Sequence, residues 1–177
     1  MITIMVEIKE AKTFQKCDAY IMGVFEDKNP FATAYDEEVN KRMNHEILDL
    51  LEAKKIKAAR KEACKLTPRK SDKLPFETVV VVGLGSKKDF DTGFLANAAG
   101  YGFQQLIDTA ESAMTSLSAL HMFTARERTE AVIQGALLGN DRVVHKKVAL
   151  KKISSLLLLG EVDKHGLNDA LAIVEGV

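Results

Sequence analysis

The clearest apolar segment of the chain is a run of four valines, Val79–Val82, with no polar residue inside it. Successive side chains of a strand point to opposite faces of a sheet, so this run would be apolar on both faces. Such a pattern is typical of a strand that is covered on both sides in an α/β sheet. We therefore predict an interior strand over residues 78–82, with Val79 and Val81 on one face and Val80 and Val82 on the other.

Five further apolar segments predict the other strands. Polar or helix-like segments separate them, and one is stopped by Pro68, which has no N–H group for a sheet ladder. These predicted strands cover residues 2–8, 19–25, 60–67, 112–122 and 153–159.

Apolar residues at helical spacing predict one long helix after the second strand. Thr33 is the expected N-cap, and acidic residues occupy positions 36–38 in the first turn, where the helix dipole favours negative charge. Lys54 and Lys55 are expected to close this helix, at the end that favours cations.

A second helix is predicted over about residues 91–109, with Asp91 or Thr92 as its cap. It contains Gly93, Gly100 and Gly102, each of which lowers helix propensity by about 1 kcal/mol relative to alanine. Small residues at these positions indicate that the helix packs closely on the sheet.

A third helix should begin at the capping box Thr124-Ala125-Arg126-Glu127 and end at Gly139-Asn140. A last helix is expected to begin near Asp163. Strands that alternate with helices in this way predict an α/β layer fold.

Length and composition indicate the number of domains and the cellular environment of the chain. A chain of 177 residues favours one domain, and 25 basic residues against 25 acidic ones leave no net field that would attract nucleic acid or a membrane. The N-terminus lacks the features of a signal peptide, and no apolar run approaches the ~20 residues of a membrane span. Cys17 and Cys64 are isolated thiols in strand-like segments, as expected in a reducing compartment. We expect a soluble, cytoplasmic protein.

The turn Gly83-Leu84-Gly85-Ser86 follows the valine strand, which is where phosphate-binding loops are found. The third glycine of a dinucleotide fingerprint is missing, and no Lys-Ser/Thr pair follows as in a P-loop. A tight structural turn is the simpler interpretation. A pocket for ADP-ribose or a nucleotide at Gly83, Gly85 and Ser86 is the alternative.

Catalytic and metal-binding patterns do not emerge from the sequence. None of the four histidines has a second His or Cys at ligand spacing, and no His-Glu-x-x-His pair occurs. We therefore predict no catalytic residue and no metal ligand in this chain, and we interpret the histidines as surface residues: His45, His121, His145 and His165.

Residues 54–73 hold nine Lys or Arg side chains against Glu62 and Asp72. A second basic stretch comprises Arg142, Lys146, Lys147, Lys151 and Lys152. Together they could contact nucleic acid, but the first stretch has no aromatic residue on which a base could stack. A solvated edge strand and loop, protected by lysine, is the interpretation we favour.

The run Val-Val-Val-Gly-Leu-Gly-x-Lys-x-x-Phe at 80–90 resembles a segment in the N-terminal domain of the leucyl (cytosol) aminopeptidase family. Residues 18–26, Asp-Ala-Tyr-Ile-Met-Gly-Val-Phe-Glu, resemble an early strand of that domain. Residues 130–139 are similar to one of its helices, although Asn140–His145 replaces the family's aromatic tract. Residues 172–177 resemble the start of its linker helix.

This resemblance implies a three-layer, macro-domain-like α/β fold, with a mixed central sheet of about six strands and helices on both faces. It implies a macro-like domain over 1–162 and, at 163–177, the beginning of a linker helix to a catalytic domain. The family's two metal-binding motifs are absent from these residues, so we expect a truncated chain without an active site.

The resemblance also implies the partners of such a domain: its own C-terminal catalytic domain, which uses two divalent ions (zinc or manganese), and the other subunits of a homo-hexamer. We expect neither a membrane nor nucleic acid as a partner. The leading hypothesis is thus the non-catalytic accessory domain of a metallo-aminopeptidase that removes N-terminal residues from peptides. The alternatives are a free-standing macro-like module that binds ADP-ribose or a nucleotide at Gly83–Ser86, and a nucleic-acid contact through residues 54–73.

Overall fold

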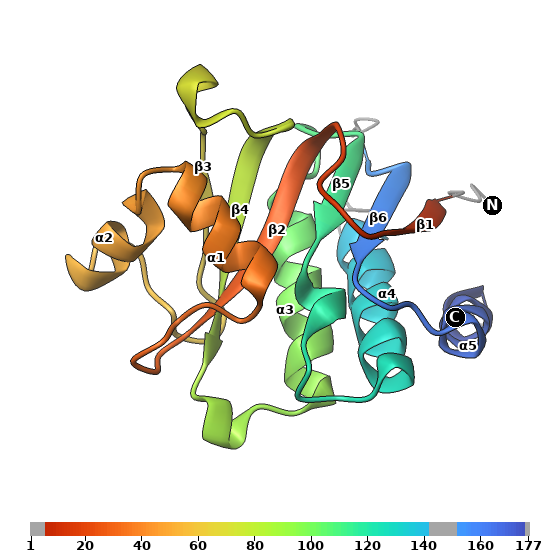
Figure 1. Cartoon of the computed structure of the whole chain (residues 1–177). Coiled ribbons are helices and arrows are strands. Elements are labelled where there is room, and N and C mark those ends of the chain that lie inside the picture. The colour runs from red at the N-terminus through yellow and green to blue at the C-terminus, as the bar shows by residue number, and fades with distance from the viewer. Residues whose placement is uncertain (1–5, 142–151, 176–177) are drawn as a thin grey trace.

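The computed structural model describes residues 6–141 and 152–175, which form one six-stranded sheet flanked by helices (Figure 1). The strand order is β1-β6-β5-β2-β4-β3. All neighbouring strands are parallel except β3 and β4, so the sheet is mixed, as predicted. The strands are β1 (Glu7–Ala11), β2 (Cys17–Phe25), β3 (Ala63–Leu66), β4 (Phe76–Gly85), β5 (Ser112–Thr115) and β6 (Ser155–Leu159).

Helices cover both faces of this sheet, and the sheet separates two hydrophobic cores (Figure 1). One core lies under α3 and α4, and the other lies under α1 and α2. The fifth helix packs against α4, beside the β1 edge of the sheet. The helices are α1 (Ala34–Arg42), α2 (Glu46–Glu52), α3 (Thr92–Gln104), α4 (Ala125–Asp141) and α5 (Lys164–Glu175).

The valine strand is interior, as predicted, because β4 pairs with β2 on one side and with β3 on the other. Val80 and Val82 belong to the core under α3 and α4, whereas Val79 and Val81 belong to the core under α1 and α2. All four side chains are at most 2% exposed. The uninterrupted valine run therefore reflects a strand that is buried on both faces.

The long helix predicted from Thr33 to Lys55 is wrong, because two helices occupy this segment. The Thr33 cap is confirmed: its hydroxyl accepts from the Asp36 N–H. The break comes at Asn44 and His45, both of which have left-handed backbone angles with φ of 55° and 63°.

The apolar spacing hides this break. Val39 and Met43 precede it and Ile47 follows it, yet all three are fully buried in the same core. The Asn40 side-chain oxygen accepts from the Leu48 N–H at 3.1 Å and so supports the start of α2. Because α2 ends at Glu52, the lysines at 54 and 55 lie beyond the helix.

Several predicted ends also shift. The first strand is Glu7–Ala11 rather than 2–8, and residues 1–5 lie outside the described structure. The strand predicted over 112–122 ends at Thr115, because the Thr115 hydroxyl accepts from the Leu117 N–H at 3.1 Å and a short 3₁₀ turn follows. The helix predicted to residue 109 ends at Gln104.

Two local predictions about helix ends and packing are confirmed. The Glu127 N–H donates to the Thr124 hydroxyl at 3.2 Å, and the Thr124 N–H donates to the Glu127 carboxylate at 3.4 Å, which is a capping box. A Cβ atom added at Gly102 would lie 2.7 Å from the Ile21 side chain. Helix α3 therefore approaches the sheet as closely as the glycines had indicated.

Candidate functional site

The turn predicted at Gly83–Ser86 is mostly the end of β4, and the N–H groups of both its glycines are already used. The Gly83 N–H donates to the Glu62 carbonyl and the Gly85 N–H donates to the Ala58 carbonyl, each at 2.8 Å. A Cβ atom at Gly83 would lie 2.0 Å from the Ala59 carbonyl oxygen. Gly85 has φ of +73°, which favours glycine. Both glycines thus serve the close approach of residues 58–62.

The backbone N–H groups that follow the turn also have partners within the chain. The Lys88 N–H donates to the Ser86 hydroxyl at 3.3 Å, and the Lys87 N–H donates to the Asp27 carboxylate at 3.1 Å. Phosphate-binding loops need free N–H groups that point at the anion, and a carboxylate at this place would repel a phosphate. These contacts favour the structural interpretation of the turn.

Part of the basic stretch 54–73 is engaged in contacts within the domain. The Arg60 guanidinium lies 3.5 Å from the centre of the Phe94 ring and donates to the Asp89 carbonyl at 3.2 Å. Arg69 pairs with Glu46 at 3.5 Å and with Asp72 at 3.8 Å. The stretch includes the edge strand β3, in line with our interpretation. Four of the five residues of the second basic stretch lie outside the described structure.

The three histidines that the structure describes, His45, His121 and His165, come from separate segments of the fold. His121 and His165 are exposed, His45 sits at the α1–α2 break with Nδ1 3.4 Å from the Asn40 amide nitrogen, and His145 lies outside the described residues. Over residues 6–141 and 152–175, no group of three or more His, Cys, Asp or Glu side chains is placed to hold a metal ion. Cys17 is buried and Cys64 is half-buried, and both are free thiols. Burial raises the pKa of Cys17 to about 12, so it is a poor nucleophile.

A buried polar cluster surrounds Asp36, a residue for which the sequence predicted only a place in the first turn of a helix, where the dipole favours negative charge. The Asp36 Oδ1 atom accepts from the Tyr20 hydroxyl at 2.8 Å and from the Ser116 hydroxyl at 2.5 Å. Its Oδ2 atom has no partner within the described structure. No spacing could have revealed the cluster, since Tyr20 and Ser116 lie 16 and 80 residues from Asp36.

The Asp36 cluster joins three parts of the fold: β2, the first turn of α1 and the residue after β5. Desolvation raises the pKa of Asp36 to about 7, and the hydrogen bonds from Ser116 and Tyr20 oppose this shift only in part. The same burial raises the pKa of Tyr20 well above its usual value. Since both side chains are fully buried, we interpret the cluster as structural.

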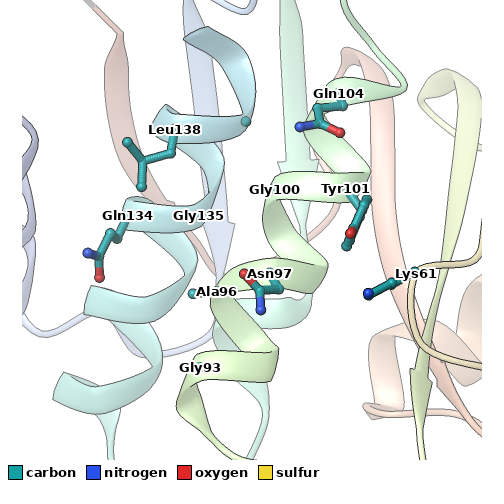
Figure 2. A pocket seen from close by; sticks show the side chains of 11 residues that line it. Lys61, Gly93, Ala96, Asn97, Gly100, Tyr101, Gln104, Gln134, Gly135 and Leu138 are labelled. Atoms are coloured by element: carbon teal, nitrogen blue, oxygen red, sulfur yellow. The ribbon is translucent and has the colours of Figure 1, made fainter. Parts of the chain in front are cut away.

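An open groove of about 840 Å³ runs along α3, with α4 on one side and Lys61 on the other (Figure 2). The two helices approach each other closely at its base. A Cβ atom at Gly135 would lie 1.9 Å from the Ala96 carbonyl oxygen, and one at Gly139 would lie 2.5 Å from the Gly100 carbonyl oxygen. The sequence analysis assigned small residues of α3 to packing on the sheet and did not foresee this contact with α4.

No helix in the described part of the chain has both the length and the apolar character that crossing a membrane requires.

The family model described as "Cytosol aminopeptidase family, N-terminal domain" matches residues 21–148. This range begins inside β2 and contains the whole of β4, the two strands on which much of the sequence resemblance rested. No curated protein matches the chain.

Solved structures share the fold at low sequence identity. A mutant of tomato leucine aminopeptidase is 16% identical with a TM-score of 0.75, and the match covers 99% of this chain and 37% of that one. The bottromycin maturation enzyme BotP is 17% identical with a TM-score of 0.63, covering 90% of this chain and 30% of that one. A structure of BotP in complex with Mn has a TM-score of 0.61. The chain therefore spans about a third of the length of these structures.

Proposed function

Because the chain belongs to the cytosol aminopeptidase family, matching its N-terminal domain, we propose that it is the non-catalytic accessory domain of a leucyl-type metallo-aminopeptidase. The observation that carries this proposal combines the extent of the family match with the extent of the shared fold. The family match extends over residues 21–148, while the fold shared with tomato leucine aminopeptidase takes in 99% of this chain but only 37% of that enzyme.

The proposed parent enzyme removes N-terminal residues from peptides. Two divalent ions, zinc or manganese, would polarise the scissile carbonyl and activate a water molecule. The described residues offer no cluster of ligands for such ions, so we assign the metals to the part of the enzyme that this chain does not cover. The BotP structure with Mn supports manganese as one metal that a structural relative accepts.

The accessory role is attachment and assembly. Residues 1–162 would form the domain, and the segment from 163, which contains α5, would begin the connection to the catalytic domain. Contacts with other subunits in a homo-hexamer are the second part of the role. A cytoplasmic location fits the description of the family as cytosolic.

The first test is an assay of the purified 177-residue chain with leucine p-nitroanilide, with and without manganese or zinc. We expect no turnover above the contamination level, measured with a mock purification from cells that lack the gene. Metal-dependent hydrolysis that co-elutes with the chain would overturn the non-catalytic role.

The second test concerns attachment. The coding region that follows codon 177 should encode a catalytic domain, and that region expressed as a separate polypeptide should co-purify with this chain and hydrolyse the anilide. A stop codon at this position in the gene, with no aminopeptidase partner encoded beside it, would favour a free-standing module instead.

A further inference from the structure

Five polar side chains face the groove along α3 without a partner of their own in the described structure: Lys61, Asn97, Tyr101, Gln104 and Gln134. Lys61, Asn97 and Tyr101 point toward the same part of the groove (Figure 2). Tyr101, Gln104 and Gln134 are only half-exposed, so their polar atoms have limited access to water. Hydrogen-bonding groups that converge on one groove from separate elements are what a polar ligand needs.

The charge of the groove favours an anionic ligand. Lys61 lines it, and no Asp or Glu is among the described residues of its wall. An adjoining pocket of about 270 Å³ shares Lys61, Asn97 and Tyr101 and adds Arg60, which is held in place over the Phe94 ring. Lys61 of the groove and Arg60 of the adjoining pocket both line that pocket, and a carboxylate beside them would form charge-assisted hydrogen bonds.

The shape of the groove favours an extended chain over a compact molecule. Its lining runs along α3 from Gly93 to Gln104, a distance of about 16 Å at the rise of an α-helix. About five residues of extended peptide span that distance. Lys61, Asn97 and Leu138 are exposed, so a compact small molecule would keep much of its surface in water.

The side chains along the groove suit a peptide backbone. Asn97, Gln104 and Gln134 each carry a donor and an acceptor, which can pair with the C=O and N–H groups of an extended chain. Leu138, which is 44% exposed, adds an apolar contact. Nucleic acid fits less well, because a phosphate backbone calls for several cations, and the groove with its adjoining pocket offers Lys61 and Arg60.

We propose that the groove between α3, α4 and Lys61 binds an extended acidic peptide segment of a partner protein. A carboxylate of the segment pairs with Lys61 and Arg60, and the amide side chains hold its backbone. All residues that line the groove belong to this chain, so peptide binding can be tested on this chain by itself.

The test is fluorescence anisotropy with a labelled heptapeptide of alternating glutamate and alanine, titrated with the 177-residue chain. We expect saturable binding that weakens as salt is raised, because the ion pairs are exposed. Lys61→Glu should weaken binding by about tenfold or more, because it replaces an attraction with a repulsion. Asn97→Ala, which leaves the charge unchanged, should weaken it by about threefold through loss of a hydrogen bond.

Lys54→Glu is the matched control. It makes the same change of charge at a residue with the same left-handed backbone, φ of 56° against 66° for Lys61, but Lys54 lines a different pocket. If Lys54→Glu and Lys61→Glu weaken peptide binding equally, the overall charge of the protein explains the loss. That result would overturn the groove as a binding site. Absence of saturable binding at millimolar protein would also overturn it, as would tighter binding of a seven-nucleotide oligothymidine than of the peptide.

Discussion

At the scale of single residues, Asp36 shows what a local pattern cannot predict. An aspartate in the first turn of a helix is favoured by the helix dipole, and this is all that its position in the sequence predicted. In the fold, α1 packs with this turn against the sheet, so the carboxyl group is buried beside Tyr20 and Ser116. Only the topology that brings β2, α1 and β5 together determines this environment.

The burial of Asp36 predicts a pH-dependent stability. Its pKa is about 7 in the folded protein against a model-compound value of 3.8, so the folded state holds the extra proton between these two values. The contribution of Asp36 to the free energy of unfolding should therefore be fully present below about pH 4 and fall as the pH rises toward 7, by at most about 1.4 kcal/mol per pH unit. Asp36→Asn cannot ionise, and its melting temperature should depend less on pH than that of the wild type.

Thermal unfolding monitored by circular dichroism between pH 4.5 and 8 checks this prediction. Glu37→Gln is the matched control, since it removes an exposed carboxylate from the same helical turn. If the wild type and Asp36→Asn show the same pH dependence, the carboxyl of Asp36 does not titrate in this range and the prediction fails.

The glycines at the end of β4 carry a second prediction at this scale. Because the N–H groups of Gly83 and Gly85 bind carbonyl oxygens of Glu62 and Ala58, ADP-ribose at millimolar concentration should leave the melting temperature unchanged. A binding site for ADP-ribose would raise the melting temperature, since a ligand at a hundredfold excess over its Kd stabilises the folded protein by about 2.7 kcal/mol. A saturable rise that Ser86→Ala or a bulky residue at Gly85 removes, in a variant that still folds, would instead support the ADP-ribose module.

At the scale of elements, the sequence predicted the features that depend on residues close in the chain. It did not predict the features that depend on how distant segments pack. The order of strands and helices followed from apolar spacing, and the Thr33 and Thr124 caps followed from residues three positions apart. The α1–α2 break did not, because the apolar positions continue through it into one core. The groove was also missed, since its walls come from segments separated by tens of residues.

The β4 strand allows a direct test of the layered arrangement. Val80→Asp should place an unpaired charge in the core under α3 and α4, at a cost of several kcal/mol, enough to unfold a domain of ordinary stability. Glu77→Asp, at an exposed position of the same strand, should be nearly neutral. Denaturant titration of both variants measures the difference, and a Val80→Asp protein as stable as the wild type would contradict burial of this face.

At the scale of the whole molecule, the two cores and the sheet form one unit, and α5 is an addition at its edge (Figure 1). It packs on α4, where Arg126 pairs with Asp169 and Gly166 lies against the Arg126 carbonyl oxygen, and its Leu167 is partly buried against the core under α3 and α4. The Arg126–Asp169 pair is about half exposed, and exposed ion pairs contribute little to stability. This arrangement suits an element that continues into a neighbouring domain, as the proposed function requires.

Helix α5 should therefore open on its own, without unfolding of the sheet. We expect the amide hydrogens of α5 to exchange with solvent much faster than those of β4, because local opening of an edge element costs less free energy than global unfolding. A chain that ends at Asp163 keeps the bond from the Asp163 N–H to the Thr129 hydroxyl and should show almost unchanged protection of β4. Hydrogen exchange followed by mass spectrometry on both chains measures these rates. If α5 exchanges as slowly as β4, or if the shorter chain loses protection throughout the sheet, then α5 belongs to the cooperative core and its role as a separable link to a second domain loses its support.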